Sequence, residues 1–186
     1  MAKYIGYCHL HCYQHGAECP GGHETPITKS KVGTKLKKGQ KFIKLGNSGT
    51  ASSGPHLHAT LGNSIKAVFG TTSQKSDLYK AIKANGWLKP FPDKQITGHY
   101  GTMSAYRKKH GMQPHSGTDW AGRSGTLIPS ITDGEIVLIQ YSKILGWVVV
   151  VKVDEESKPE PKPIQKKNVA KEIVCPNCGV HYVESK

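Results

Sequence analysis

Short segments in which apolar and polar residues alternate make up most of the chain, and glycine-containing turns separate them. The first such segment, residues 4–10, reads Tyr-Ile-Gly-Tyr-Cys-His-Leu. Because successive side chains of a strand point to opposite faces, strict alternation predicts that His9 lies on the face of Tyr7. Cys8 and Leu10 are then expected on the opposite face.

Two longer stretches repeat the pattern. In residues 32–62, brief β-type segments alternate with Gly turns, as in small antiparallel barrels. Residues 115–153 do the same, and they contain an apolar run at 148–151 of the kind that is buried on both faces of a sheet. The pattern predicts a mainly β fold, built as an antiparallel β barrel-sandwich.

Between these stretches, residues 63–95 form a connector with a different character. Leu78 and Ile82 are four residues apart, a threonine or serine upstream offers a cap, and Gly86 offers an end. This spacing predicts one short helix over about residues 73–85, inside the connector.

Composition divides the chain into three parts. Residues 1–153 are the predicted main domain, with its core in 4–62 and 96–153. Residues 154–171 are charged and Pro-rich, a composition that cannot bury a core and is typical of a linker. Residues 172–186 are predicted to form a small zinc-ribbon-like hairpin with Cys-x-x-Cys at its turn.

The net charge of the chain is +13, from 26 Lys and Arg against 13 Asp and Glu. Such a balance favours an anionic partner, for example nucleic acid, a membrane surface or an acidic cell-wall polymer. The lysines are scattered and aromatic residues are sparse, so we expect no nucleic-acid partner. No apolar run reaches the roughly 18 residues of a transmembrane segment, and we expect no signal peptide because the first residues lack an apolar stretch.

The candidate chemistry lies in two histidine motifs. Gly54-Pro55 leads into His56-Leu57-His58, where the two histidines share one face of a strand. His115 and Asp119 form a His-x-x-x-Asp motif. Two imidazoles and one carboxylate are a ligand set of catalytic zinc sites, because they leave one coordination position for water or substrate.

Three motifs together resemble those of the lysostaphin-type (LytM-like) zinc endopeptidases, which cut peptidoglycan cross-bridges. They are His-x-x-x-Asp at 115–119, Tyr-x-His-Leu at 7–10 and Gly-Pro-His-Leu-His at 54–58. The resemblance covers roughly residues 4–62 and 96–153. It implies a peptidoglycan peptide as substrate.

The resemblance also implies roles for individual residues. His58, His115 and Asp119 would be the ligands of one catalytic Zn²⁺. His9 and His56 would be the catalytic pair beside the metal, with their separate roles left open. One would take a proton from a zinc-bound water, and the other would stabilise the oxyanion or protonate the leaving amine.

Two further site predictions concern Tyr106 and the C-terminal cysteines. Tyr106 is the nearest candidate for a family tyrosine that assists the oxyanion, although its spacing from the His-x-x-x-Asp motif departs from the family. Cys175 and Cys178 are half of a structural zinc site and need two more ligands. The other cysteines at 8, 12 and 19 or His23 could supply them, as could a second chain, and the pair could also be a plain turn.

The order of the motifs departs from the family, in which His-x-x-x-Asp comes first. The sequence therefore resembles a circularly permuted member, with the ordinary ends joined through residues 63–95 and the chain opened before Tyr4. Permutation of this kind is tolerated where the original ends are exposed and close together. The strand ending at Val153 should then lie beside strand 4–10, within one molecule or between two swapped chains. We expect pairing within one molecule and a monomer.

These observations predict a zinc metalloendopeptidase that hydrolyses peptidoglycan peptides. It would act on the bacterial cell wall as a phage-encoded lysin or virion component, delivered by phage lysis or in the particle. One alternative is a non-catalytic cell-wall-binding module of the same fold. Another is a basic adaptor that binds nucleic acid through its C-terminal hairpin.

Overall fold

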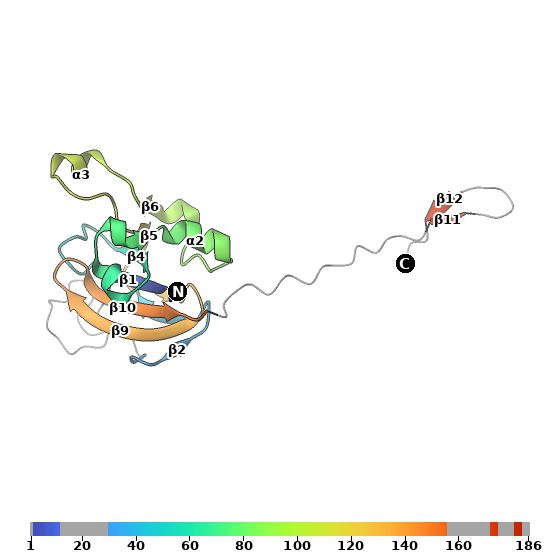
Figure 1. Ribbon diagram of the computed structural model, residues 1–186, viewed down its shortest axis with the longest axis horizontal. Helices are drawn as coiled ribbons and strands as arrows, with labels where there is room; N and C mark the ends of the chain where they lie inside the picture. Colours follow the sequence, from blue (N-terminus) through green and yellow to red (C-terminus); the bar gives the residue numbers. More distant parts are fainter. Residues whose placement is uncertain (1, 12–29, 156–171, 175–180, 184–186) are drawn as a thin grey trace.

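A computed structural model describes residues 2–11, 30–155, 172–174 and 181–183. As predicted, the fold is mainly β, with antiparallel sheets and few helices (Figure 1). The strands of the main body are β1 (Tyr4–Leu10), β2 (Lys35–Leu36), β3 (Lys41–Lys44), β4 (His56–Gly62), β5 (Lys75–Ser76), β6 (Ile96–Gly98), β7 (Thr118–Ala121), β8 (Leu127–Pro129), β9 (Gly134–Ser142) and β10 (Gly146–Val153).

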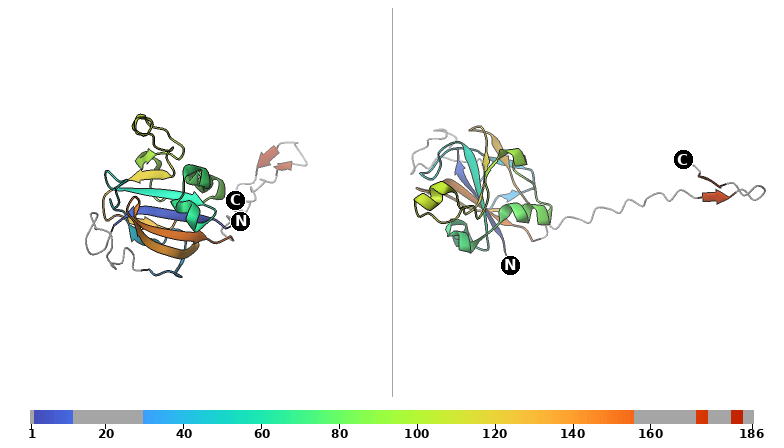
Figure 2. Two further views of the ribbon diagram at one scale, coloured as in Figure 1. Left: turned by 60° about the vertical axis from the view of Figure 1, so that its left-hand side comes forward. Right: turned by 90° about the horizontal axis from the view of Figure 1, so that it is seen from above.

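One large sheet organises the molecule, in the order β2-β9-β10-β1-β4-β7-β6, with β5 added at one end of β4. β1 lies in its middle: Tyr4 pairs with Lys152 of β10 on one side and with Gly62 of β4 on the other. The strands run side by side in both views of Figure 2. The prediction that the strand ending at Val153 lies beside strand 4–10 is confirmed, and the pairing occurs within one chain.

The main core lies between this sheet and the two-stranded β3–β8 ribbon. Phe42 and Ile43 of β3 and Ile128 of β8 belong to the same buried cluster as residues of β1, β4 and β10. Alternate residues of β10 enter this cluster, and Val148 and Val150 enter a second cluster on the opposite face. The prediction that β10 is buried on both faces is therefore confirmed.

The prediction that side chains alternate strictly between the two faces along β1 was wrong. His9 has a φ of 59°, and the pairing of β1 with β10 shifts register between Tyr7 and Leu10. Because this bulge adds one residue, Leu10 enters the same buried cluster as Tyr7, and Cys8 enters the other. His9 does not share the face of Tyr7; its ring lies 4.7 Å from that of His56, between centroids.

The connector contains more structure than the single predicted helix. Helix α1 (Ile65–Phe69) precedes a 3₁₀ turn and β5, and α2 (Leu78–Asn85) follows. The predicted end is confirmed, since Gly86 adopts the left-handed conformation at φ 63°. The predicted start was five residues too early, because the Asp77 side chain caps α2 by accepting from the Lys80 amide.

A third helix and a separate hairpin complete the described structure. Helix α3 (Ala105–Lys109) stands on a loop away from the sheet (Figure 1). Strands β11 (Glu172–Val174) and β12 (His181–Val183) pair antiparallel, on either side of the predicted Cys-x-x-Cys turn. Cys175 and Cys178 lie outside the described residues, as does most of the predicted linker. Among the described helices, none has the length and apolar character needed to cross a membrane.

Candidate metal centre

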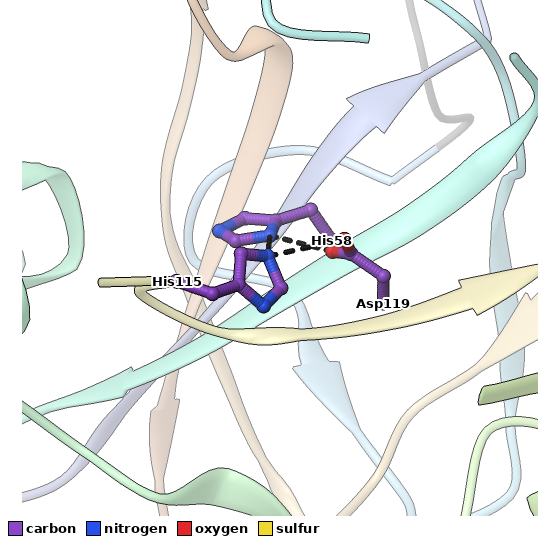
Figure 3. Close-up of side chains that lie close together, drawn as sticks. All are labelled: His58, His115 and Asp119. Carbon is purple, nitrogen blue, oxygen red and sulfur yellow. Dashed lines mark hydrogen bonds and ion pairs between the residues drawn. The ribbon is translucent and has the colours of Figure 1, made fainter. Parts of the chain in front are cut away.

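The pairing of β4 with β7 builds the centre of the site. It sets His58 directly opposite Asp119, so the two side chains leave the same face of the sheet. His115 approaches from the loop before β7, and the three side chains converge (Figure 3). One strand pair therefore brings together the His-x-x-x-Asp and His-x-His motifs, whose residues were predicted to share one metal ion.

The potential ligand atoms of the three residues are close enough to share one ion. His58 Nδ1 lies 2.7 Å from Asp119 Oδ1, and His115 Nε2 lies 3.0 Å from Asp119 Oδ2. The two imidazole nitrogens are 3.2 Å apart. A tetrahedral ion with bonds of about 2.0–2.1 Å would separate its ligand atoms by roughly 3.3 Å, so only small adjustments would admit it.

Neighbouring backbone fixes how the imidazoles face the group. His115 donates its Nδ1–H to the carbonyl of His99 at 3.1 Å, which leaves Nε2 toward Asp119. Gly117 lies so close to β4 that a Cβ there would be 2.5 Å from the Ala59 carbonyl and 2.7 Å from the His58 ring. The close approach of the ligand loop therefore requires glycine at 117.

Burial and hydrogen bonding set the charge of the group. Burial disfavours an ionised Asp119, but hydrogen bonds from His115 and His58 outweigh it and hold the carboxyl pKa well below its usual range. Burial lowers the pKa of His58, which favours the neutral imidazole that binds metals. Two nitrogens and a carboxylate oxygen suit a divalent cation, and three protein ligands leave a position open. The buried group could thus hold a metal ion.

His9 and His56 flank this group, as predicted. The His9 ring is 5.8 Å from that of His58, and His56 Nε2 is 3.9 Å from Asp119 Oδ1. His9 donates its Nδ1–H to the Ser48 carbonyl at 2.8 Å, and His56 donates its own to the Gly54 carbonyl at 2.8 Å. Each ring therefore keeps Nε2 free of these backbone contacts.

The environment of His9 is fixed on several sides. The Ser48 hydroxyl donates to the Leu10 carbonyl and accepts from the Trp147 amide, so the carbonyl that orients His9 is held by both β1 and β10. Burial, partly opposed by the hydrogen bond to Ser48, lowers the pKa of His9 to about 4. His9 is therefore neutral at pH 7 and can accept a proton.

An open pocket of about 290 Å³ reaches the group from solvent. It is lined by Ser53, Gly54, Pro55, His56, Thr97, Asp119 and Ala121. One wall therefore carries His56 and the carboxylate, so a ligand entering here meets both.

Tyr106 is not brought to this group. It lies on α3 with 66% of its surface exposed, and its ring packs on His110 at 4.4 Å between centroids. The candidate role of Cys175 and Cys178 falls outside the described residues.

Sequence reasoning missed the groups that orient the imidazoles. His99, Ser48 and Gly54 orient the imidazoles through their backbone carbonyls. Every residue type has such a carbonyl, so the sequence carries no signal for this role. Gly117 did carry a signal, because a glycine between two ligands in His-x-Gly-x-Asp indicates a close backbone approach.

No protein-family model matches this sequence. No solved structure matches the chain. Function is therefore inferred from the side chains of the site and from the motifs that carry them.

Proposed function

We propose that this chain is a zinc-dependent endopeptidase that hydrolyses peptide bonds of bacterial peptidoglycan. One observation carries the proposal: a three-ligand group with an open position lies beside two further histidines, both oriented by backbone carbonyls. A metal site that only stabilised the fold would ordinarily be closed by four protein ligands.

His58, His115 and Asp119 would hold the zinc. The ion, when bound, polarises a carbonyl and lowers the pKa of water from about 15.7 to about 7. His9 and His56 supply the proton chemistry beside it, one accepting a proton from water and the other donating to the developing oxyanion or leaving amine. The pocket beside His56 admits the peptide.

The substrate is inferred from the resemblance to lysostaphin-type endopeptidases in three motifs. The permuted order is compatible with that family because β1 pairs with both β10 and β4 within one chain. We further propose that the main sheet and the β3–β8 ribbon together form a barrel-sandwich of the family type. Their shared core supports this.

The site of action follows from the proposed substrate. A net charge of +13 would help to hold the enzyme on an anionic cell wall, and salt would weaken the attraction. From the lysostaphin-type resemblance we propose that it acts on this wall as a phage-encoded lysin or virion component.

The test measures zinc and hydrolysis separately in the full chain. Purified peptidoglycan from several bacteria is digested, and mass spectrometry identifies the new termini. Wild-type protein should contain zinc, lose turnover with a chelator and regain it with added Zn²⁺. Asp119→Ala should lose both zinc and turnover.

The catalytic pair should behave differently from the ligands. His9→Ala and His56→Ala should retain zinc and lose about 10²–10⁴-fold in turnover. His110→Ala is the control, because His110 is an exposed histidine at the C-cap of α3. Full zinc content in Asp119→Ala, or release of no peptide termini by zinc-loaded wild type, would contradict the proposal.

A further inference from the structure

The connector does more than join two parts of the chain. Its residues 72–76, which we call the brace, lie against the segment 114–116 that carries the ligand His115. The Thr72 hydroxyl donates to the Pro114 carbonyl at 2.6 Å, and Lys75 Nζ donates to the Ser116 hydroxyl at 3.1 Å. Two bonds therefore hold the residues on both sides of the ligand, one at the Pro114 backbone and one at the Ser116 side chain.

The brace is itself held in place. The Tyr100 hydroxyl lies 2.9 Å from the Thr72 carbonyl and 3.1 Å from that of Lys75, so it fixes the brace from the other side. Strand β5 pairs with the end of β4, the strand that carries His58. The brace thus links the two elements that supply the histidine ligands.

Lys75 is the unusual member of the brace. It is only 8% exposed, and no carboxylate in the described part of the chain forms an ion pair with it. Burying a cation without a counter-ion is unfavourable, and here burial lowers the pKa of Lys75. Its position is not explained by stability alone, and the proposed peptidase chemistry does not use it.

We propose that Lys75 and Thr72 are positioning residues, which fix His115 for metal binding through Ser116 and Pro114. The inference depends on the proposed metal centre and not on the substrate. Polar partners outside the ligand shell commonly orient metal-binding side chains, and their loss typically costs about 10–100-fold in metal affinity.

Lys75 could affect metal binding through its charge or through its bond to Ser116, and the two effects predict opposite changes in metal affinity when Lys75 is replaced. If the ammonium acted only through its charge, it would repel a bound cation, and its removal would tighten metal binding. If it acts by holding Ser116, its removal loosens metal binding. Lys75→Met keeps most of the side-chain volume and removes both the charge and the donor. The direction in which its Zn²⁺ affinity changes therefore decides between the two effects.

Thr72→Val tests the other bond at constant charge. It removes the hydroxyl that donates to Pro114 and keeps the branched shape. Ser73→Ala is the control, because Ser73 is an exposed residue of the same turn and its hydroxyl contacts the Thr71 hydroxyl. Ser116→Ala removes the partner of Lys75.

Three measurements on the full chain are needed: the Zn²⁺ dissociation constant against a competing chelator, the visible spectrum of the Co²⁺ form, and the melting temperature of the metal-free protein. We expect Thr72→Val and Lys75→Met each to weaken Zn²⁺ binding by roughly 10–100-fold and to change the Co²⁺ spectrum. Ser73→Ala should match wild type. Adding Ser116→Ala to Lys75→Met should cause no further loss, since the two residues act through one bond.

Tighter Zn²⁺ binding by Lys75→Met, or unchanged affinity in Thr72→Val, would overturn the proposal. An equal loss of Zn²⁺ affinity in Ser73→Ala would overturn it as well. A variant with an unchanged metal-free melting temperature separates positioning from general instability. No step measures hydrolysis, so a wild type that binds zinc but cuts no peptidoglycan contradicts only the proposed function. A wild type that binds no divalent ion contradicts both.

Discussion

His9 combines a rare backbone conformation with a buried side chain. Its φ of 59° lies in the left-handed region, which costs an L-residue roughly 1–2 kcal/mol. The conformation belongs to the bulge that turns the imidazole toward His56. Residues held in such conformations are concentrated at functional sites, which agrees with the role proposed for His9.

Comparing two substitutions of His9 isolates the backbone cost. His9→Gly and His9→Ala both remove the ring, but only glycine adopts this φ without strain. We expect His9→Gly to be more stable than His9→Ala by about 1 kcal/mol in denaturant unfolding, although glycine is the more flexible residue. Both should lose about 10²–10⁴-fold in turnover. Equal stabilities of the two variants would show that the left-handed backbone conformation at residue 9 does not destabilise the fold.

Asp133 provides a pH-dependent contribution to stability. Its carboxylate accepts from the Lys38 amide at 2.6 Å and lies 3.2 Å from Lys37 Nζ, and these contacts lower its pKa below the usual value of an aspartate. A lowered folded-state pKa stabilises the fold above the unfolded pKa, and this stabilisation is lost as the pH falls through the folded pKa. Asp133→Asn should therefore melt below wild type at pH 7, and the difference should shrink as the pH falls below about 4. A constant difference over this range would contradict the assignment.

At the scale of elements, the sequence predicted the strands well and the connector poorly. The apolar run of β10 and the Gly86 stop were predictable because each depends on local residue types. The start of α2 was not, because Lys75 and Ser76 pair with β4, a contact distant in sequence. The bulge at His9 was missed for the same reason, since alternation alone carries no signal for an inserted residue. The group of His58, His115 and Asp119 was predictable because the residue types and spacing of potential metal ligands are visible in the sequence.

Helix α3 is the element whose observed place changes an expectation. With Tyr106 exposed on α3 and packed on His110, we expect Tyr106→Phe to keep the wild-type turnover. The free energy of unfolding should change by no more than about 0.5 kcal/mol, as for most surface substitutions. Steady-state hydrolysis of a peptidoglycan fragment measures the turnover, and urea unfolding measures the free energy of unfolding. A large loss of kcat at unchanged KM would restore the role of Tyr106 at the oxyanion.

At the scale of the whole molecule, the site combines residues that lie far apart along the chain. His9 comes from the first strand, and Asp119 lies far along the chain. Their meeting within one chain requires no second molecule, and a monomer avoids the association cost of a dimer. The described structure is therefore compatible with a self-sufficient site.

Mixing two inactive variants tests this. His9→Ala and Asp119→Ala are unfolded, combined in equal amounts and refolded together. A monomer should recover no activity, because every chain lacks one essential group. Swapped dimers would regain one intact site in each mixed pair, so about a quarter of wild-type activity would return. Refolding each variant alone is the control.

The central place of β1 also has a consequence for biosynthesis. β1 is synthesised before both of its neighbours, and one of them, β10, ends only at Val153. One edge of β1 therefore stays unpaired until nearly the whole domain has been translated, and pairings this distant in sequence fold slowly. A nascent chain would expose an apolar strand edge to other chains for that time. We expect the yield of soluble protein to fall sharply as expression is accelerated, while His9 of β1 reaches its final surroundings only in the last stage of folding.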